Sequence, residues 1–206
     1  ARFFPGRQVL SAEQAAALKA DPRYYRDCSD AVLVSSRGGL RFERTFLEAF
    51  LRPGYGMENW VSRSNYPALK VIPTGKAKMS FFVNRNYGQP TAELRRYELR
   101  LDGFASLHAG YGGGEMTTRP FRFSGEQLEL NYSTSAAGFV RVELQDEGGR
   151  ALAGHSLAEA PELIGDEIDR AYAWKGGVNV AVLRGRTVRM KVILKDADLY
   201  SYRFGA

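Results

Sequence analysis

The sequence predicts an all-β protein whose residues 95–206 form an antiparallel β-sandwich of the jelly-roll or concanavalin-like type. Apolar and polar residues alternate over several stretches of this region, as strands with one buried face require. Turn-forming groups rich in Gly and Asp separate these stretches. The composition agrees, because 12% aromatic residues and 22 glycines favour strands joined by tight turns over helices.

Four stretches carry the alternation that predicts the sandwich. Each places Leu, Val, Met or aromatic side chains on one face and mainly polar or charged side chains on the other, so we expect about eight strands in the whole region. Trp174 and the tyrosines around Tyr200 are expected to lie in the core. The alternating stretches are residues 128–132, 140–145, 188–194 and 200–204, and turns are expected at residues 146–149, 175–177, 184–185 and 196–198.

Residues 1–94 are predicted to form a separate region with a short N-terminal helix. Ser11 and Gln14 have the spacing of a capping box before an Ala-rich run, and Asp21-Pro22 should end the helix. A buried strand is expected at residues 32–34, while residues 45–51 fit either a helical face or a loop.

Short strands are predicted to follow one another between residues 66 and 101. The expected strands 69–72, 79–84 and 94–101 are separated by a turn at residues 73–76 and a loop at residues 86–90. Consecutive antiparallel strands with this spacing occur in both propeller blades and sandwiches. The pattern alone therefore leaves both architectures open for this region.

The composition limits the partners. The net charge of +6 suggests nucleic acid, but the basic stretches 95–100 and 184–191 alternate with apolar residues as solvated strand faces do, and no nucleic-acid motif is present. We therefore expect no nucleic-acid partner. No apolar run approaches the ~20 residues of a membrane span. Cys28 is the single cysteine, which excludes an intrachain disulfide and leaves the compartment open.

Several longer stretches resemble a known group of proteins. RYELRLDGFASLHAGYGGGEMTTRPFRFSG, at residues 96–125, and LRGRTVRMKVILKDADLYSYRF, at residues 183–204, are similar to the C-terminal sandwich of bacterial proteins related to glycoside hydrolase families 32 and 43. DAVLVSSRGGLRFERTF, NWVSRSNYPAL and FVNRNYGQPTAELRRYELR resemble the last one or two blades of the five-bladed propeller that carries the active site in those hydrolases. The resemblance thus implies propeller blades in residues 1–94, followed by the sandwich.

The resemblance also implies what this chain lacks. Such glycosidases take their catalytic carboxylates from early blades, and neither an Asn-Asp-Pro nor an Arg-Asp-Pro motif occurs here. We therefore expect a C-terminal portion of a glycoside hydrolase-like protein that is inactive alone. Its expected partners are carbohydrate and either the missing N-terminal propeller region or a second subunit. The alternative is a non-catalytic carbohydrate-binding or self-assembling sandwich module.

Asp30 is the candidate catalytic acid. If residues 31–34 form the innermost strand of a blade, the resemblance places Asp30 near the central pocket of the propeller. The alternative is a turn or cap acid, because Asp is common before strands. Asp27 is a weaker candidate for the same reason.

A loop-like segment supplies the candidate sugar-binding residues. It combines flat apolar side chains with guanidinium and amide groups that could hydrogen-bond sugar hydroxyls. A turn at Tyr66-Pro67 and an ion pair of Arg63 are the structural alternatives. The candidates are Trp60, Arg63, Asn65 and Tyr66, with Tyr87 from the next loop.

No metal or cofactor site is predicted. His108 and His155 are the only histidines and lie far apart in the sequence, whereas zinc needs three or four ligands. Asp166, Asp196 and Asp198 could help bind calcium at a sandwich edge, but turn chemistry is the favoured explanation.

Overall fold

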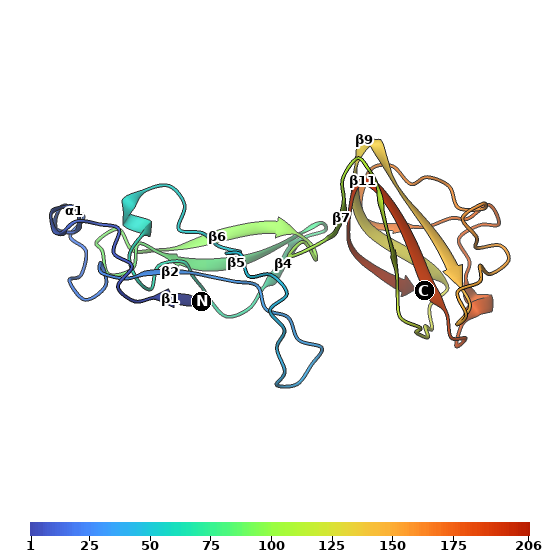
Figure 1. Cartoon of the computed structure of the whole chain (residues 1–206), viewed down its shortest axis with the longest axis horizontal. Helices are drawn as coiled ribbons and strands as arrows, with labels where there is room; N and C mark the ends of the chain where they lie inside the picture. The colour runs from blue at the N-terminus through green and yellow to red at the C-terminus, as the bar shows by residue number, and fades with distance from the viewer. The chain divides into compact units, whose positions relative to one another are not determined.

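A computed structural model describes all residues, 1–206, and confirms a mostly β protein with 43% strand and 6% helix. The sheets are curled and include a half-barrel. The chain divides into two compact units, Ala1–Arg100 and Leu101–Ala206 (Figure 1). The division follows strand β6, whereas the domain boundary expected from the sequence, between residues 94 and 95, falls near the start of that strand.

The first unit contains two sheets. Strand β5 is the centre of the larger one, with β6 along one side and with β3 and β4 on the other, all antiparallel. The smaller sheet pairs β1 with β2 and sets Arg2 opposite Asp30. The elements are β1 (Arg2–Phe4), α1 (Ala12–Ala17), β2 (Cys28–Asp30), the 3-10 helix η1 (Met57–Asn59), β3 (Tyr66–Pro67), β4 (Ile72–Gly75), β5 (Lys78–Arg85) and β6 (Glu93–Arg100).

The predicted N-terminal helix and its capping box are confirmed. The Ser11 hydroxyl accepts a hydrogen bond from the Gln14 backbone N–H at 3.1 Å, and the Gln14 side chain accepts one from the Ser11 N–H at 2.8 Å. These two bonds satisfy amide groups that the first helical turn leaves without partners. Because α1 has only six residues, it depends on packing, which buries Ala15 against Leu10 and Val61.

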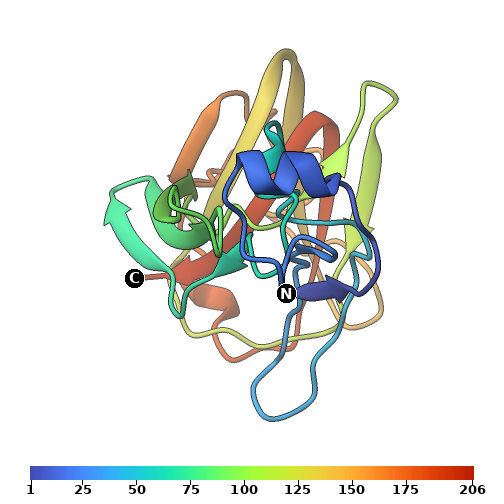
Figure 2. The same ribbon diagram turned by 90° about the vertical axis from the view of Figure 1, so that its left-hand side faces the viewer.

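Two strand predictions in this unit are wrong in position. Residues 32–34 form no strand. The strand here is β2, which ends before Ala31, because the N-terminal segment pairs with residues 28–30. After Ala31 the chain leaves the sheet, and residues 35–43 project as a loop closed by the bridge of Ser35 to Glu43 (Figures 1 and 2). Strand β4 begins only at Ile72, since the chain turns at residues 76–77, later than expected. Residues 45–51 form neither a helix nor a regular strand.

The first unit buries few large apolar side chains and exposes many. Its two clusters of buried residues are Leu10, Ala15, Ala20 and Val61, and Ala31, Leu51, Phe81 and Val83. Exposed apolar residues outnumber these buried ones, and such surface usually marks a site of interaction. The exposed group includes Leu40, Phe42, Phe46, Leu47, Tyr55, Leu69, Val71, Ile72 and Leu94.

The second unit is built around two long strands. Strands β9 and β11 run antiparallel side by side, with β10 on the outer side of β9 and with β7 and β8 along the other side of β11 (Figure 1). All five belong to one curled sheet. The elements are β7 (Leu107–Ala109), β8 (Gly114–Thr117), β9 (Gln127–Gln145), β10 (Asp166–Ala171), the 3-10 helix η2 (Ala181–Leu183) and β11 (Arg189–Gly205).

Stretches predicted as separate strands are joined in the structure. Residues 128–132 and 140–145 both lie in β9, and residues 200–204 continue the strand that starts at Arg189. The turn predicted at residues 196–198 is wrong, because Asp196 sits in a bulge with φ of 43° and the strand resumes at Ala197. Bulges bend a strand without ending it, which explains how two strands curl the sheet. The turns at residues 146–149 and 184–185 are confirmed.

A single cluster of buried apolar side chains forms the core of this unit. Trp174 is buried as expected, and its indole N–H donates to the Val142 carbonyl at 2.9 Å. The Tyr172 ring contacts the Trp174 ring edge-on at 4.7 Å between centroids. The Tyr172 hydroxyl donates to the Pro161 carbonyl at 2.8 Å and accepts from the Val142 N–H at 3.1 Å. Buried aromatic groups with polar tips therefore anchor the covering loops to β9.

Tyr172 predicts a loss of stability at high pH. Burial raises the pKa of Tyr172 to about 12, against about 10 in an unfolded chain. Below pH 10 the neutral Tyr172 hydroxyl contributes fully to the unfolding free energy. This contribution, at most about 3 kcal/mol, is lost as the pH rises through 12. Urea unfolding followed at Trp174 between pH 9 and 12 should show this decline, and Tyr172→Phe should make it shallower. The exposed Tyr111→Phe is the control, and an unchanged slope in Tyr172→Phe would contradict the assignment.

Candidate functional site

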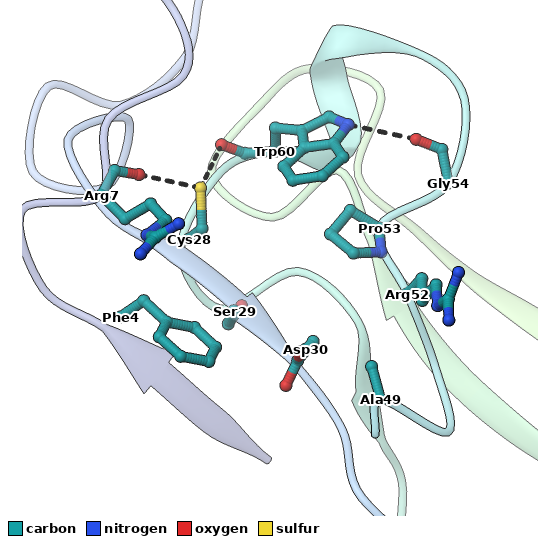
Figure 3. A pocket seen from close by; sticks show the side chains of 10 residues that line it. All are labelled: Phe4, Arg7, Cys28, Ser29, Asp30, Ala49, Arg52, Pro53, Gly54 and Trp60. Atoms are coloured by element: carbon teal, nitrogen blue, oxygen red, sulfur yellow. Dashed lines mark hydrogen bonds between the residues drawn. The ribbon is translucent and has the colours of Figure 1, made fainter. Parts of the chain in front are cut away.

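A groove of about 570 Å³ lies in the first unit (Figure 3). Strands β1 and β2 form one wall, the segment 49–54 forms the other, and Trp60 closes one end. Its size falls within the range of small-molecule sites. The lining residues are Phe4, Arg7, Cys28, Ser29, Asp30, Ala49, Arg52, Pro53, Gly54 and Trp60.

Asp30 lies in this groove but is engaged by an arginine. Arg2 Nε donates to Asp30 Oδ1 at 2.7 Å, and Arg2 Nη2 donates to Asp30 Oδ2 at 2.6 Å. The third donor, Nη1, binds the Leu47 carbonyl at 2.8 Å. The hydrogen bonds and the charge of Asp30 raise the pKa of Arg2. With both oxygens in a two-bond ion pair, Asp30 in this geometry holds β1 on β2 rather than presenting a free carboxylate.

Asp27 has a structural contact of its own. Its Oδ1 accepts a hydrogen bond from the Gly6 N–H at 2.8 Å, across the β1–β2 connection. The residue lines a smaller hollow of about 270 Å³ together with Phe3, Tyr24 and Arg63. Asp27 therefore acts here as a loop acid, which is the alternative reading that its sequence position allows.

Trp60 is the second predicted residue that lines the groove. Its indole N–H donates to the Gly54 carbonyl at 3.1 Å, which ties η1 to the segment 49–54. Part of the ring packs on the cluster around Leu10 and Val61, and the rest remains open to the groove. Trp60 thus offers a fixed aromatic wall.

Asn65 is buried and fully used inside the protein. Its amide N–H groups donate to the carbonyls of Ser29 at 3.1 Å and Asn59 at 3.2 Å, and its Oδ1 accepts from Arg85 Nη1 at 2.7 Å. No part of its side chain reaches solvent. The structure therefore places Asn65 under the site, where it joins β2, η1 and β5.

Arg63, Tyr66 and Tyr87 lie outside the groove. The Arg63 guanidinium lies 4.8 Å from the centroid of the Tyr24 ring, and the Tyr24 and Tyr87 rings form a T-shaped pair with 5.3 Å between centroids. The Tyr66 ring packs against Phe3, and its hydroxyl is buried without a hydrogen-bond partner. Burial raises the pKa of Tyr66, while the charge of Arg63 opposes that shift. Of the six predicted residues, the groove brings together only Asp30 and Trp60.

The sequence reasoning missed Arg2, Arg7, Arg52 and Cys28. The Cys28 thiol donates to the Arg7 carbonyl at 2.9 Å and lies 3.6 Å from the Trp60 carbonyl (Figure 3). Burial raises the pKa of Cys28, and the nearby charge of Arg7 partly opposes this. Cys28 is therefore a structural thiol. No local motif marks these residues, since Arg2 and Asp30 meet only through the pairing of β1 with β2.

The ion pair of Arg2 and Asp30 predicts a measurable coupling. Asp30→Asn should lower the unfolding free energy of the first unit by about 1 to 2 kcal/mol, because half-buried donors of Arg2 lose a charged acceptor. Adding Arg2→Gln should cost less than the sum of the single changes. Amide hydrogen exchange in β2 would measure this. Asp21→Asn, which removes an exposed pair with Arg23, should have little effect, and strictly additive costs would contradict the coupling.

No metal centre or serine relay is assembled. No group of three His, Cys, Asp or Glu side chains is placed to hold a metal ion. Ser106 Oγ and His108 Nδ1 both contact Asp198 Oδ1, at 2.6 and 3.1 Å, so the serine bonds the acid instead of the imidazole that a relay requires.

No helix has the length and apolar character needed to cross a membrane.

Comparison with known proteins gives the groove no assignment. The resemblance to glycoside hydrolase families 32 and 43 therefore stays a prediction from sequence motifs, and the geometry of the groove carries the functional argument. The chain matches no protein-family model, no curated protein and no solved structure.

Proposed function

We propose that this chain is the C-terminal portion of a glycoside hydrolase-like protein, in which residues 1–100 provide a saccharide-binding groove. The observation that carries the proposal is the combination of two aromatic side chains, Phe4 and Trp60, with polar groups in one groove of about 570 Å³. Sugars present apolar C–H faces and hydroxyl groups at once, and sites for them pair aromatic rings with a few hydrogen-bonding groups.

The catalytic step belongs to carboxylates outside this chain. A glycosidase needs two carboxyl groups placed about 5 to 9.5 Å apart across the scissile bond. Asp30 is the only acid that lines the groove, and Arg2 holds both of its oxygens. The groove therefore binds without cleaving, and the second unit, residues 101–206, supports the propeller that carries the acids.

The apolar surface of the first unit supports a protein partner. Three apolar side chains are largely exposed: Leu40 by 98%, Phe42 by 64% and Leu69 by 91%. Contact of such apolar surface with water is unfavourable. Contact with the N-terminal propeller region, or with a second subunit, would bury such side chains. The resemblance to propeller blades favours the first of these partners.

The test compares binding with turnover. Calorimetry on this chain with a panel of plant and microbial oligosaccharides should detect binding, and Trp60→Phe should retain the fold while weakening it. Product analysis should detect no hydrolysis by the chain alone, and activity only when the propeller region is present. Turnover by the chain alone, or the absence of any saccharide binding, would overturn the proposal.

A second candidate is a non-catalytic binding or self-assembling module. It is favoured by β6, an eight-residue strand whose outer edge pairs with no other strand, since such edges recruit strands of other molecules. Light scattering after size exclusion separates the candidates. A stable monomer or a defined oligomer with saccharide binding supports the module, whereas concentration-dependent association that ends when the propeller region is supplied supports the first proposal.

A further inference from the structure

The positive charge of the protein lies in the unit that contains the groove. Residues 1–100 contain 17 Lys and Arg against 9 Asp and Glu, a formal charge of +8. Residues 101–206 contain 12 against 14, a formal charge of −2. An excess of this size raises the local concentration of anions around the first unit.

The groove itself has a positive balance. The charge of Asp30 is cancelled by its ion pair with Arg2. The side chains of Arg7 and Arg52 are exposed and make no hydrogen bond or ion pair in the structure. Two guanidinium groups at the groove are therefore without acidic partners.

Arg7 is fixed by its backbone and leaves its side chain available. Its N–H donates to the Phe4 carbonyl at 3.2 Å, and its carbonyl accepts from the Cys28 thiol at 2.9 Å. Figure 3 shows its guanidinium on the groove wall near Cys28, whereas Arg52 belongs to the opposite wall and its guanidinium points away from the other lining residues. The charge of Arg7 also acts on Cys28 in this wall. It lowers the pKa of the Cys28 thiol, although burial raises that pKa by more.

A planar guanidinium suits a carboxylate in particular. Its donors match the two carboxylate oxygens, and a bond between charged groups is about twice as strong as a neutral one. Phe4 lies directly beside Arg7 in the wall, with Trp60 across the groove (Figure 3). An aromatic ring and a carboxylate recognition group thus line the same wall of the groove.

We propose that the groove selects acidic saccharides, with a uronic acid residue whose ring face contacts Phe4 or Trp60 and whose carboxylate pairs with Arg7. This inference rests on the proposed saccharide groove and adds the class of its ligand. No covalent step is involved, since Asp30 stays bonded to Arg2.

The experiment uses one saccharide in two charge states. Calorimetry would compare tetragalacturonate with its fully methyl-esterified form, which keeps the sugar rings and removes the negative charges. Wild-type protein should bind the acid at least about tenfold more tightly than the ester. Arg7→Gln should abolish most of this preference, because it should weaken binding of the acid much more than binding of the ester.

A matched variant separates the groove from general charge. Arg37 lies in the projecting loop, is exposed and has no side-chain partner, so Arg37→Gln removes the same charge from the same unit. It should keep the preference for the acid. Equal losses in Arg7→Gln and Arg37→Gln would show a non-specific polyanion effect and overturn the inference.

The outcomes also separate this inference from the function beneath it. Selection for acids would be overturned by equal binding of the acid and the ester, or by a preference for neutral oligosaccharides whose binding Trp60→Phe weakens. Either result would still support the saccharide groove. Failure of every saccharide, acidic or neutral, to bind the wild-type chain would overturn both proposals.

Discussion

Arg85→Met is expected to lower the unfolding free energy of the first unit by about 3 kcal/mol. Arg85 is 5% exposed and joins three separate parts of the unit. Its Nη1 donates to Asn65 Oδ1 at 2.7 Å and to the Tyr97 hydroxyl at 3.0 Å, and its Nη2 donates to the Pro53 carbonyl at 2.7 Å. Methionine fills much of the same volume but leaves these acceptors without donors.

The opposing effect is the cost of burying the guanidinium. Arg85 has no carboxylate partner and its buried Nε has no acceptor, so removing the charge recovers some desolvation free energy. We expect the lost hydrogen bonds to dominate, because Asn65 is completely buried and cannot turn to water. Hydrogen exchange of β5 amides would measure the change. A more stable Arg85→Met protein would show that desolvation dominates instead.

A graded series isolates the contribution of each contact. Tyr97→Phe removes one acceptor of Arg85 and should cost about 0.5 to 1 kcal/mol. Arg85→Lys keeps the charge but cannot span Asn65 and Pro53 together, so it should fall between Tyr97→Phe and Arg85→Met. Because Pro53 lines the groove, Arg85→Lys should also weaken saccharide binding more than Tyr97→Phe does.

The strands were predictable where apolar and polar residues alternate, although two such stretches belong to one strand in β9. The alternation at residues 79–84, 94–101, 128–132, 140–145 and 188–194 matches strands β5, β6, β9 and β11. The connections were less predictable, because Asp196 has the composition of a turn but occupies a bulge. A bulge depends on what the opposite strand does, and the local sequence does not contain that information.

The candidate site was also predictable only in part. Trp60 could be chosen from its own properties, as a large aromatic residue in a loop-like segment, and it does line the groove. Asp30 also lies there, but its ion pair comes from Arg2, 28 residues earlier. Asn65 has suitable chemistry for sugars, yet long-range packing of β2, η1 and β5 buries it. Residue type predicts what a side chain can do, and tertiary contacts decide whether it is free to do it.

Gly138→Ala should destabilise the second unit by about 2 to 3 kcal/mol, since overpacking against main chain cannot be relieved by turning a side chain. Gly138 lies in the part of β9 that faces the Asp196 bulge. A Cβ at this position would come within 2.3 Å of the Asp196 carbonyl oxygen and 2.6 Å of the Lys195 carbonyl oxygen. Either β9 or the bulge in β11 must move to accept it.

The absence of a side chain at Gly138 therefore lets the two bent strands approach closely enough to curl the sheet. Gly176→Ala is the matched control, because a Cβ there meets nothing within 4 Å and the backbone is unstrained. Hydrogen exchange should show faster opening of β9 and β11 around the bulge in Gly138→Ala, and native protection in Gly176→Ala. If Gly138→Ala were as stable as the control, the curl would have to come from the bulge residues alone, and Asp196→Gly, which relaxes φ of 43°, would then be the substitution that changes stability.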